Sequence, residues 1–131
     1  MILKSTEISR VLSITEATYA AERAKMMELN RQETAIRAQI QGLNLSRHDA
    51  RGTTEEHLIA NSEADFLWLN WVDNSLKSLN QSLSRILVEK SRLAITLAHC
   101  FGRNEVMQSL FVESKKIEIK KRERRDEENS S

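Results

Sequence analysis

Hydrophobic residues in the second half of the chain recur at alternating steps of four and three residues. Such steps keep one narrow face of a helix apolar over many turns, as in a coiled coil. The pattern therefore predicts a long coiled-coil helix over about residues 54–125 rather than the helix of a globular core. We call this face the seam. Its positions are Leu69, Val72, Leu76, Leu79, Leu83, Ile86, Lys90, Leu93, Leu97 and Cys100, of which Lys90 is charged.

The first half of the chain carries a second series with the same spacing. Ser5 or Thr6 can cap the N-terminus of a helix there, and Glu7 in the first turn favours the helix dipole. The pattern predicts a first helix over about residues 5–45. Its seam positions are Ile8, Leu12, Thr15, Tyr19, Glu22, Met26, Leu29, Glu33, Ile36, Ile40 and Leu43, which are uncharged except for the two glutamates.

A polar segment separates the two series. Residues 46–53 contain Gly52 and no large apolar side chain, which is typical of a turn. Thr53 followed by Glu56 has the form of a capping box, so the second helix is expected to begin near residue 54. Two long amphipathic helices joined by a short turn favour an antiparallel hairpin. We expect one all-α coiled-coil hairpin domain over residues 1–131, with a frayed polar tail over residues 126–131.

The second helix is expected to be longer than the first. If Leu43 packs near Leu58, Ile8 lies level with residues 93–97, and the chain after Phe101 extends beyond the first helix. Gly102 is a candidate kink at that point, because glycine costs about 1 kcal/mol relative to alanine inside a helix.

Composition and charge exclude several classes of protein. The chain has 131 residues, no proline, three glycines and few aromatic residues, and it lacks the strands and turns of an α/β enzyme. A net charge of +1 argues against a purely electrostatic binder of nucleic acid. The single cysteine cannot form an internal disulfide. No secretory signal and no apolar run of about 20 residues is present, so we expect a soluble cytoplasmic protein.

Catalytic and metal-binding motifs are missing from the sequence. There is no glycine-rich phosphate loop and no nucleophile elbow, and His48, His57 and His99 have no metal-ligand spacing. His99 and Cys100 are adjacent, which places their side chains about 100° apart on a helix rather than around one metal ion. We expect no enzymatic activity, no cofactor, no metal and no small-molecule substrate.

Large apolar side chains surround the seam near the start of the second helix. A helix that is apolar on nearly every side is normally covered on every side, and one neighbouring helix covers only one. Either the turn folds over these residues through Leu43, Leu45 and Leu58, or they form an exposed docking patch. The residues are Phe66, Leu67, Trp68 and Trp71; we call them the aromatic cluster.

The C-terminal part of the second helix combines an apolar stripe with a basic end. Val106, Leu110, Glu113 and Ile117 share one stripe, and Phe111 lies beside it. A basic helix end can be a solvated face at the negative pole of the dipole. Together with an uncovered stripe, it also fits a segment that docks into an acidic or apolar groove of a partner protein. The basic residues proposed for binding are Lys120, Lys121, Arg122, Arg124 and Arg125.

This layout resembles the flagellar FliJ family and its type III secretion relatives, the YscO-like proteins. The similarity lies in a long helix, a polar turn, and a second leucine-rich helix that reads WLNWVDNSLKSLNQSLSRILVEKSRL and then EVMQSLFVESKKIEIKKRERRDEE. The first helix is shorter than in the family pattern, and Gly102 is a candidate interruption of the continuous stalk that the family would have.

The resemblance implies a stalk-like antiparallel coiled coil, similar to the central stalk of rotary ATPases, at the cytoplasmic face of the inner membrane. Its partners would be the export ATPase, the export gate and secretion chaperones. Residues 8–12 and 106–125 would face the ATPase, and the aromatic cluster would contact the gate or chaperones. The alternative is a generic structural coiled coil or secretion chaperone that acts as a homodimer. Binding of membrane or nucleic acid through residues 115–125 is a third, weaker reading.

Overall fold

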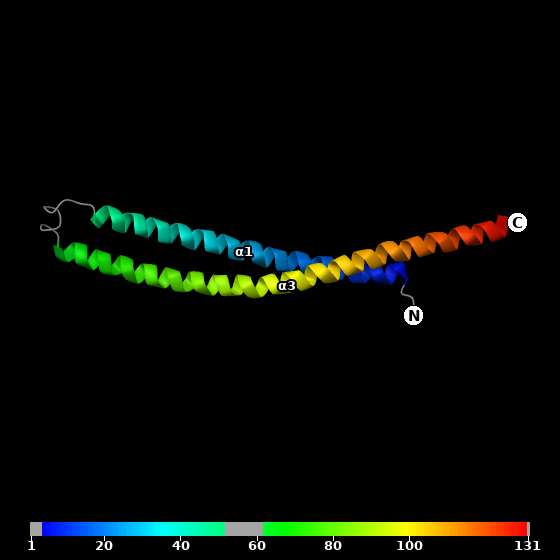
Figure 1. The fold of residues 1–131 in the computed structure, drawn as a ribbon, viewed down its shortest axis with the longest axis horizontal. Helices are drawn as coiled ribbons and strands as arrows, with labels where there is room; N and C mark the ends of the chain where they lie inside the picture. Colours follow the sequence, from blue (N-terminus) through cyan, green and yellow to red (C-terminus); the bar gives the residue numbers. More distant parts are fainter. Residues whose placement is uncertain (1–3, 52–61, 131) are drawn as a thin grey trace. The chain divides into compact units, whose positions relative to one another are not determined.

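The protein folds into two long α-helices that pack against each other. The structure, a computed structural model, describes residues 4–51 and 62–130. Helix α1 spans Ser5–Arg51 and helix α3 spans Ser62–Ser130, and no strand occurs within these residues. The predicted all-α helical hairpin is confirmed (Figure 1).

The chain divides into two compact units, and each contains a part of both helices. Unit 1 comprises Met1–Lys25 and Leu93–Ser131, and unit 2 comprises Met26–Arg92. Each unit is a pair of helical segments described below by its own contacts.

The predicted seam of α1 is the face that the helix buries. Every position from Ile8 to Leu43 in that series is buried or half-buried, while the residues between them are nearly all exposed. The same steps continue by one position at either end, to the buried Ser5 and the half-buried Arg47. Coiled-coil spacing therefore accounts for the packing of nearly the whole helix.

The predicted seam of α3 is also buried, and it continues past Cys100 without a change of spacing. Val72, Leu76, Ile86 and Cys100 are its most buried apolar side chains. Beyond Cys100, steps of four and three lead to five further seam residues. In unit 1 these residues lie on the side of α3 that packs against α1. These are Asn104, Met107, Phe111, Ser114 and Glu118, all buried or half-buried.

The two helical segments of unit 1 run antiparallel. The Ser5 N–H donates to the Glu118 carboxylate, 3.2 Å away, and the Thr15 hydroxyl lies 3.0 Å from the Asn104 side-chain oxygen. Further along α1, Tyr19 contacts the ring of Phe101. As the residue number in α1 increases, the contacting residue in α3 has a lower number, which shows that the two segments are antiparallel.

Unit 2 has the same antiparallel pairing. Glu33 of α1 is paired with Lys90 of α3 at 2.6 Å, and Arg47 is paired with Asp73 at 3.0 Å. This register places Leu43 near the level of Leu76. Leu58, which was expected near Leu43, lies outside the described residues. In unit 1, Ile8 lies between the Ser5–Glu118 and Thr15–Asn104 contacts, so its expected place level with residues 93–97 is wrong.

Several predicted boundaries differ from the structure. Helix α1 continues to Arg51, so residues 46–51 are helical rather than part of a turn. The capping box at Thr53 and Glu56 lies outside the described residues, as does Leu58. Helix α3 continues to Ser130, so the expected frayed tail is helical as far as that residue.

The N-terminus of α1 and the glycine of α3 also depart from expectation. The Lys4 carbonyl accepts from the Ile8 N–H at 3.1 Å, so Lys4 rather than Ser5 or Thr6 occupies the cap position. Helix α3 runs through Gly102 without a break, and Gly102 does not have a positive φ. The helical hydrogen bonds on either side are sufficient to hold a single glycine in helical conformation at a cost of about 1 kcal/mol.

Candidate functional site

The C-terminal end of α3 continues past the start of α1. In unit 1 the contact between Ser5 and Glu118 marks the level at which α1 begins, and α3 goes on to Ser130 (Figure 1). Residues 119–130, which we call the C-terminal extension, are all exposed. This corrects the expectation that everything after Phe101 lies beyond the first helix: the uncovered part starts after Glu118. The expectation was wrong because α1 is longer than predicted: residues 46–51, predicted as part of the turn, are helical.

The C-terminal extension contains all five basic residues that were proposed for binding. Lys120, Lys121, Arg122, Arg124 and Arg125 are exposed and closely spaced on one stretch of helix. A cluster of like charges without a covering helix attracts anionic groups of a partner and accelerates association at low salt. Because the charges are exposed, each ion pair would contribute little on its own.

The apolar residues proposed for binding occupy two different faces of α3. Val106, Leu110 and Ile117 are exposed, Val106 to 59%, whereas Phe111 is half-buried in the seam towards α1. Phe111 therefore packs in the interface between the two helices. Val106, Leu110 and Ile117 form a neighbouring face of α3 that α1 does not cover. We call these three residues the apolar flank.

Sequence reasoning missed two seam positions of unit 1. Asn104 is buried and bonded to Thr15, and Glu118 accepts from the first backbone N–H of α1. The signal was present, since continuing the steps of four and three from Cys100 leads directly to both residues. The predicted stripe of Val106, Leu110 and Ile117 lies one residue away from this series.

Glu118 caps α1 from the opposite helix. The first N–H groups of a helix have no acceptor inside it, and a carboxylate there also favours the helix dipole. Hydrogen bonds from the Ser5 hydroxyl and the Ser5 N–H lower the pKa of Glu118 below its ordinary value of 4.5. Glu118 thus fixes the level at which the C-terminal extension begins.

We expect replacement of Glu118 by glutamine to weaken the hairpin above pH 4.5 and to reduce its loss of stability in acid. Because the folded-state pKa of Glu118 is lowered, its stabilisation is present above the unfolded pKa and is lost as the pH falls through the folded pKa. Urea denaturation followed by circular dichroism at a series of pH values measures this. Glu113→Gln, at an exposed position of the same helix, is the control. Equal pH dependence of Glu118→Gln and the wild type would contradict the role of Glu118.

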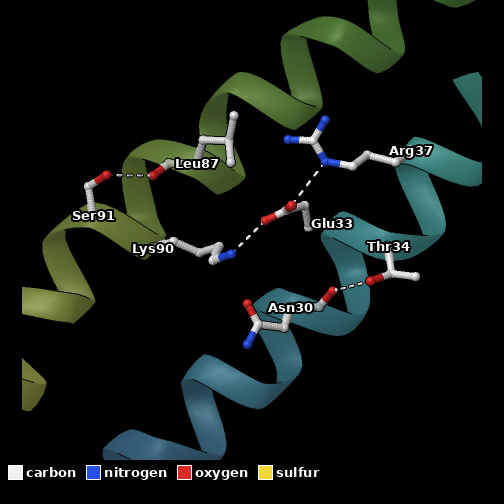
Figure 2. Close-up of polar contacts among 7 residues, drawn as sticks. All are labelled: Asn30, Glu33, Thr34, Arg37, Leu87, Lys90 and Ser91. Atoms are coloured by element: carbon white, nitrogen blue, oxygen red, sulfur yellow. Dashed lines mark hydrogen bonds and ion pairs between the residues drawn. The ribbon is translucent and has the colours of Figure 1, made fainter.

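A polar layer interrupts the seam of unit 2. Figure 2 shows the Glu33 carboxylate between Lys90 of α3, at 2.6 Å, and Arg37 of α1, at 2.9 Å. These contacts lower the pKa of Glu33, with Lys90 making the larger contribution. Two of the three charged residues in the predicted seams, Glu33 and Lys90, therefore pair with each other. Such pairs mainly specify which register two helices adopt.

The aromatic cluster is exposed in unit 2. Phe66 is 70% exposed, Leu67 66% and Trp71 58%, whereas Trp68 is 36% exposed. Leu45, which would cover it in one of the two readings left open by the sequence, is itself exposed, and Leu58 lies outside the described residues. Trp71 and Leu43 line a groove of about 640 Å³ beside Gly42. The aromatic cluster therefore remains a candidate docking patch.

Residues 4–51 and 62–130 hold no group of histidine, cysteine or acidic side chains arranged to bind a metal ion. In the same residues no helical stretch is apolar enough to cross a bilayer.

Comparison with known proteins gives no match: no protein-family model, curated protein or solved structure is similar to this chain.

Proposed function

We propose that this chain is a non-catalytic stalk or adaptor of a flagellar or type III protein-export ATPase complex. The observation that supports it most is the C-terminal extension, an exposed stretch of helix that continues past the start of α1 and carries its five basic residues within residues 120–125, followed by acidic residues at 126–128. A single helix is narrow, about 10–12 Å across with its side chains, which suits entry into the opening of a ring. The extension would dock there, while the rest of the hairpin stays outside.

The packing of the hairpin supports a role as a rigid element. In each unit the seam of α1 is paired with the seam of α3, and polar pairs fix the register at Thr15–Asn104 and Glu33–Lys90. A helix pair with a fixed register transmits displacement along its axis better than one that can slip. The proposed mechanism is therefore mechanical: the hairpin would organise or couple motion in the ring without taking part in hydrolysis.

The aromatic cluster is proposed as a second contact, with the export gate or secretion chaperones. Exposed tryptophan beside other large apolar groups is typical of interface hot spots. Phe66, Leu67, Trp68 and Trp71 lie in unit 2, whereas the C-terminal extension belongs to unit 1. One chain could thus engage two partners through separate surfaces at the cytoplasmic face of the inner membrane.

A second candidate is a structural coiled coil or secretion chaperone that forms a homodimer. The observation in its favour is the apolar flank of Val106, Leu110 and Ile117, which α1 leaves exposed. A second copy of α3 could cover this flank.

The function is tested by adding the full chain to the cognate export ATPase and measuring ATP hydrolysis. We expect turnover to rise with chain concentration and to saturate as the ring sites fill. Turnover that is the same with and without the chain, at low and physiological salt, would count against the stalk function.

A further inference from the structure

A groove runs along α1 and α3 in unit 1. Its volume is about 610 Å³, and its lining includes Val11 from α1 and Ala98, Gly102, Val106 and Met107 from α3. Val11 and Val106 are exposed, so their apolar side chains line the groove at the molecular surface. We call this the Gly102 groove. Two adjacent helices with apolar edges offer the surface on which a third helix packs in a bundle.

The glycine in this groove has no explanation within the hairpin. Gly102 is helical and does not have a positive φ, and a Cβ atom added to it would meet no atom within 4 Å. Glycine costs about 1 kcal/mol relative to alanine in a helix interior. What glycine does provide is space for the close approach of another chain.

The charges around the Gly102 groove identify the chemistry of that chain. Arg103 is the charged residue in its lining, and no carboxylate lines it. The apolar flank continues the same side of α3, where Glu113 is the one acidic residue of the stripe, and steps of four and three from Ile117 lead on to two basic residues, Lys121 and Arg124. A chain that buries apolar side chains in the Gly102 groove and against the apolar flank would thus also contact basic side chains towards the C-terminus of α3. Acidic residues beside its apolar stripe would be complementary.

We propose that the Gly102 groove and the apolar flank bind an amphipathic α-helix of a partner protein, with acidic residues beside its apolar stripe. The inference rests on the proposed function only in taking the chain to act by binding proteins. The third helix would lie along α1 and α3 of unit 1 and cover Val11, Val106 and Leu110.

A second copy of this chain fits the same surface less well. In an antiparallel pair of α3 helices centred on Leu110, Lys121 would lie opposite His99, and Arg124 opposite Thr96, neither of which is a carboxylate. In a parallel pair the basic residues would face one another, and like charges repel. An antiparallel pair centred on Ile117 would place Lys121 opposite Glu113, but it would also place Leu110 opposite Arg124 and Val106 opposite Glu128. A second copy thus gains charge pairing only by setting charged residues against the apolar flank, which favours an acidic amphipathic helix over self-association.

The test uses a fluorescein-labelled synthetic helical peptide with leucine at coiled-coil seam positions and glutamate beside them. A matched peptide carries lysine in place of each glutamate. In fluorescence anisotropy titrations of the full chain, we expect the acidic peptide to bind at least about tenfold more tightly, which corresponds to about 1.4 kcal/mol.

Substitutions then locate the binding surface. Gly102→Leu fills the groove and is expected to weaken binding of the acidic peptide by about tenfold or more, while helix content is kept because leucine is a better helix former than glycine. Ala35→Leu is the control, since it places a leucine at another exposed small residue, on α1 in unit 2 and away from both grooves. If Gly102→Leu fails to fold, Val106→Asp at the exposed edge of the groove takes its place.

Three results would overturn the inference. The first is equal affinity for the acidic and basic peptides, or no binding of either. The second is an equal loss of binding in Ala35→Leu and Gly102→Leu. The third is self-association of the chain that Gly102→Leu removes, which would make a second copy the occupant. The assay contains no ATPase, so its failure is distinguishable from failure of the stalk function.

Discussion

Deleting residues 119–131 is expected to reduce the ATPase turnover produced by the chain to the basal rate of the ATPase alone. The deletion removes the C-terminal extension and its basic residues. It leaves the seam pairs between α1 and α3, including the contact of Ser5 with Glu118. Because the hairpin keeps its packing, loss of stimulation would report on docking rather than on folding. Circular dichroism of the truncated chain checks that the remaining helix is intact.

The length of the deletion decides what this experiment means. Removing residues 106–131 would also remove Met107, Phe111 and Glu118 from the seam of unit 1, and the N-terminal part of α1 would then lose its partner. Deleting only residues 126–131 is the matched control, since it shortens the helix but leaves every basic residue of the extension in place. Full stimulation by the chain that lacks residues 119–131 would contradict docking through the extension.

Leu76→Ala is expected to destabilise the hairpin by about 2–5 kcal/mol. Leu76 lies in the seam of unit 2 and is only 8% exposed, so its truncation removes apolar contacts and leaves a cavity between the helices. A slender two-helix hairpin can collapse around a cavity more easily than a globular core, which places the expected value towards the lower end of that range. Urea denaturation monitored by the helical circular dichroism signal measures the change in the free energy of unfolding.

Leu67→Ala provides the comparison for Leu76→Ala. It makes the same chemical change on the same helix, but Leu67 is exposed and lies outside the seam. We expect it to change the free energy of unfolding by less than about 0.5 kcal/mol. Equal destabilisation by both substitutions would mean that the seam is not the face that holds the helices together.

The seams were predictable from the sequence because coiled-coil packing depends on spacing more than on the detail of any one side chain. Steps of four and three identified the buried face of α1 from Ile8 to Leu43 and that of α3 from Leu69 to Cys100. Even Glu22 and Glu33 are half-buried at the positions that the spacing assigns them. The all-α hairpin followed from the same pattern.

The register of the hairpin was not predictable from the apolar pattern alone. Sliding one helix past the other by seven residues returns apolar positions to apolar positions, so hydrophobic spacing scarcely distinguishes one register from the next. Polar pairs do distinguish them: Glu33 meets Lys90, and Thr15 meets Asn104. Treating the charged seam residues as partners rather than as defects would have given the correct register.

The candidate site was only partly predictable for the same reason. The basic residues of the extension and the exposure of Val106, Leu110 and Ile117 are as expected, but Phe111 was assigned to the wrong face. The seam continues beyond Cys100 through small and polar residues, among them Asn104 and Ser114. A search for apolar residues at seam spacing does not detect such positions. The residue at which α3 extends past α1 is set by the register of the two helices. The contact of Ser5 with Glu118 marks that residue, and the apolar pattern did not predict it.

Sedimentation equilibrium of the chain, alone and with the cognate export ATPase, tests the central claim most directly. If the two helices satisfy each other's seams within one chain and the extension docks into a ring, the chain alone has the mass of a monomer, 15.1 kDa, at micromolar concentration. Added to the assembled ATPase, it should sediment with the ring. A dimer at the same concentration, together with no sedimentation of the chain with the ATPase, would contradict the stalk function and favour the homodimeric coiled coil.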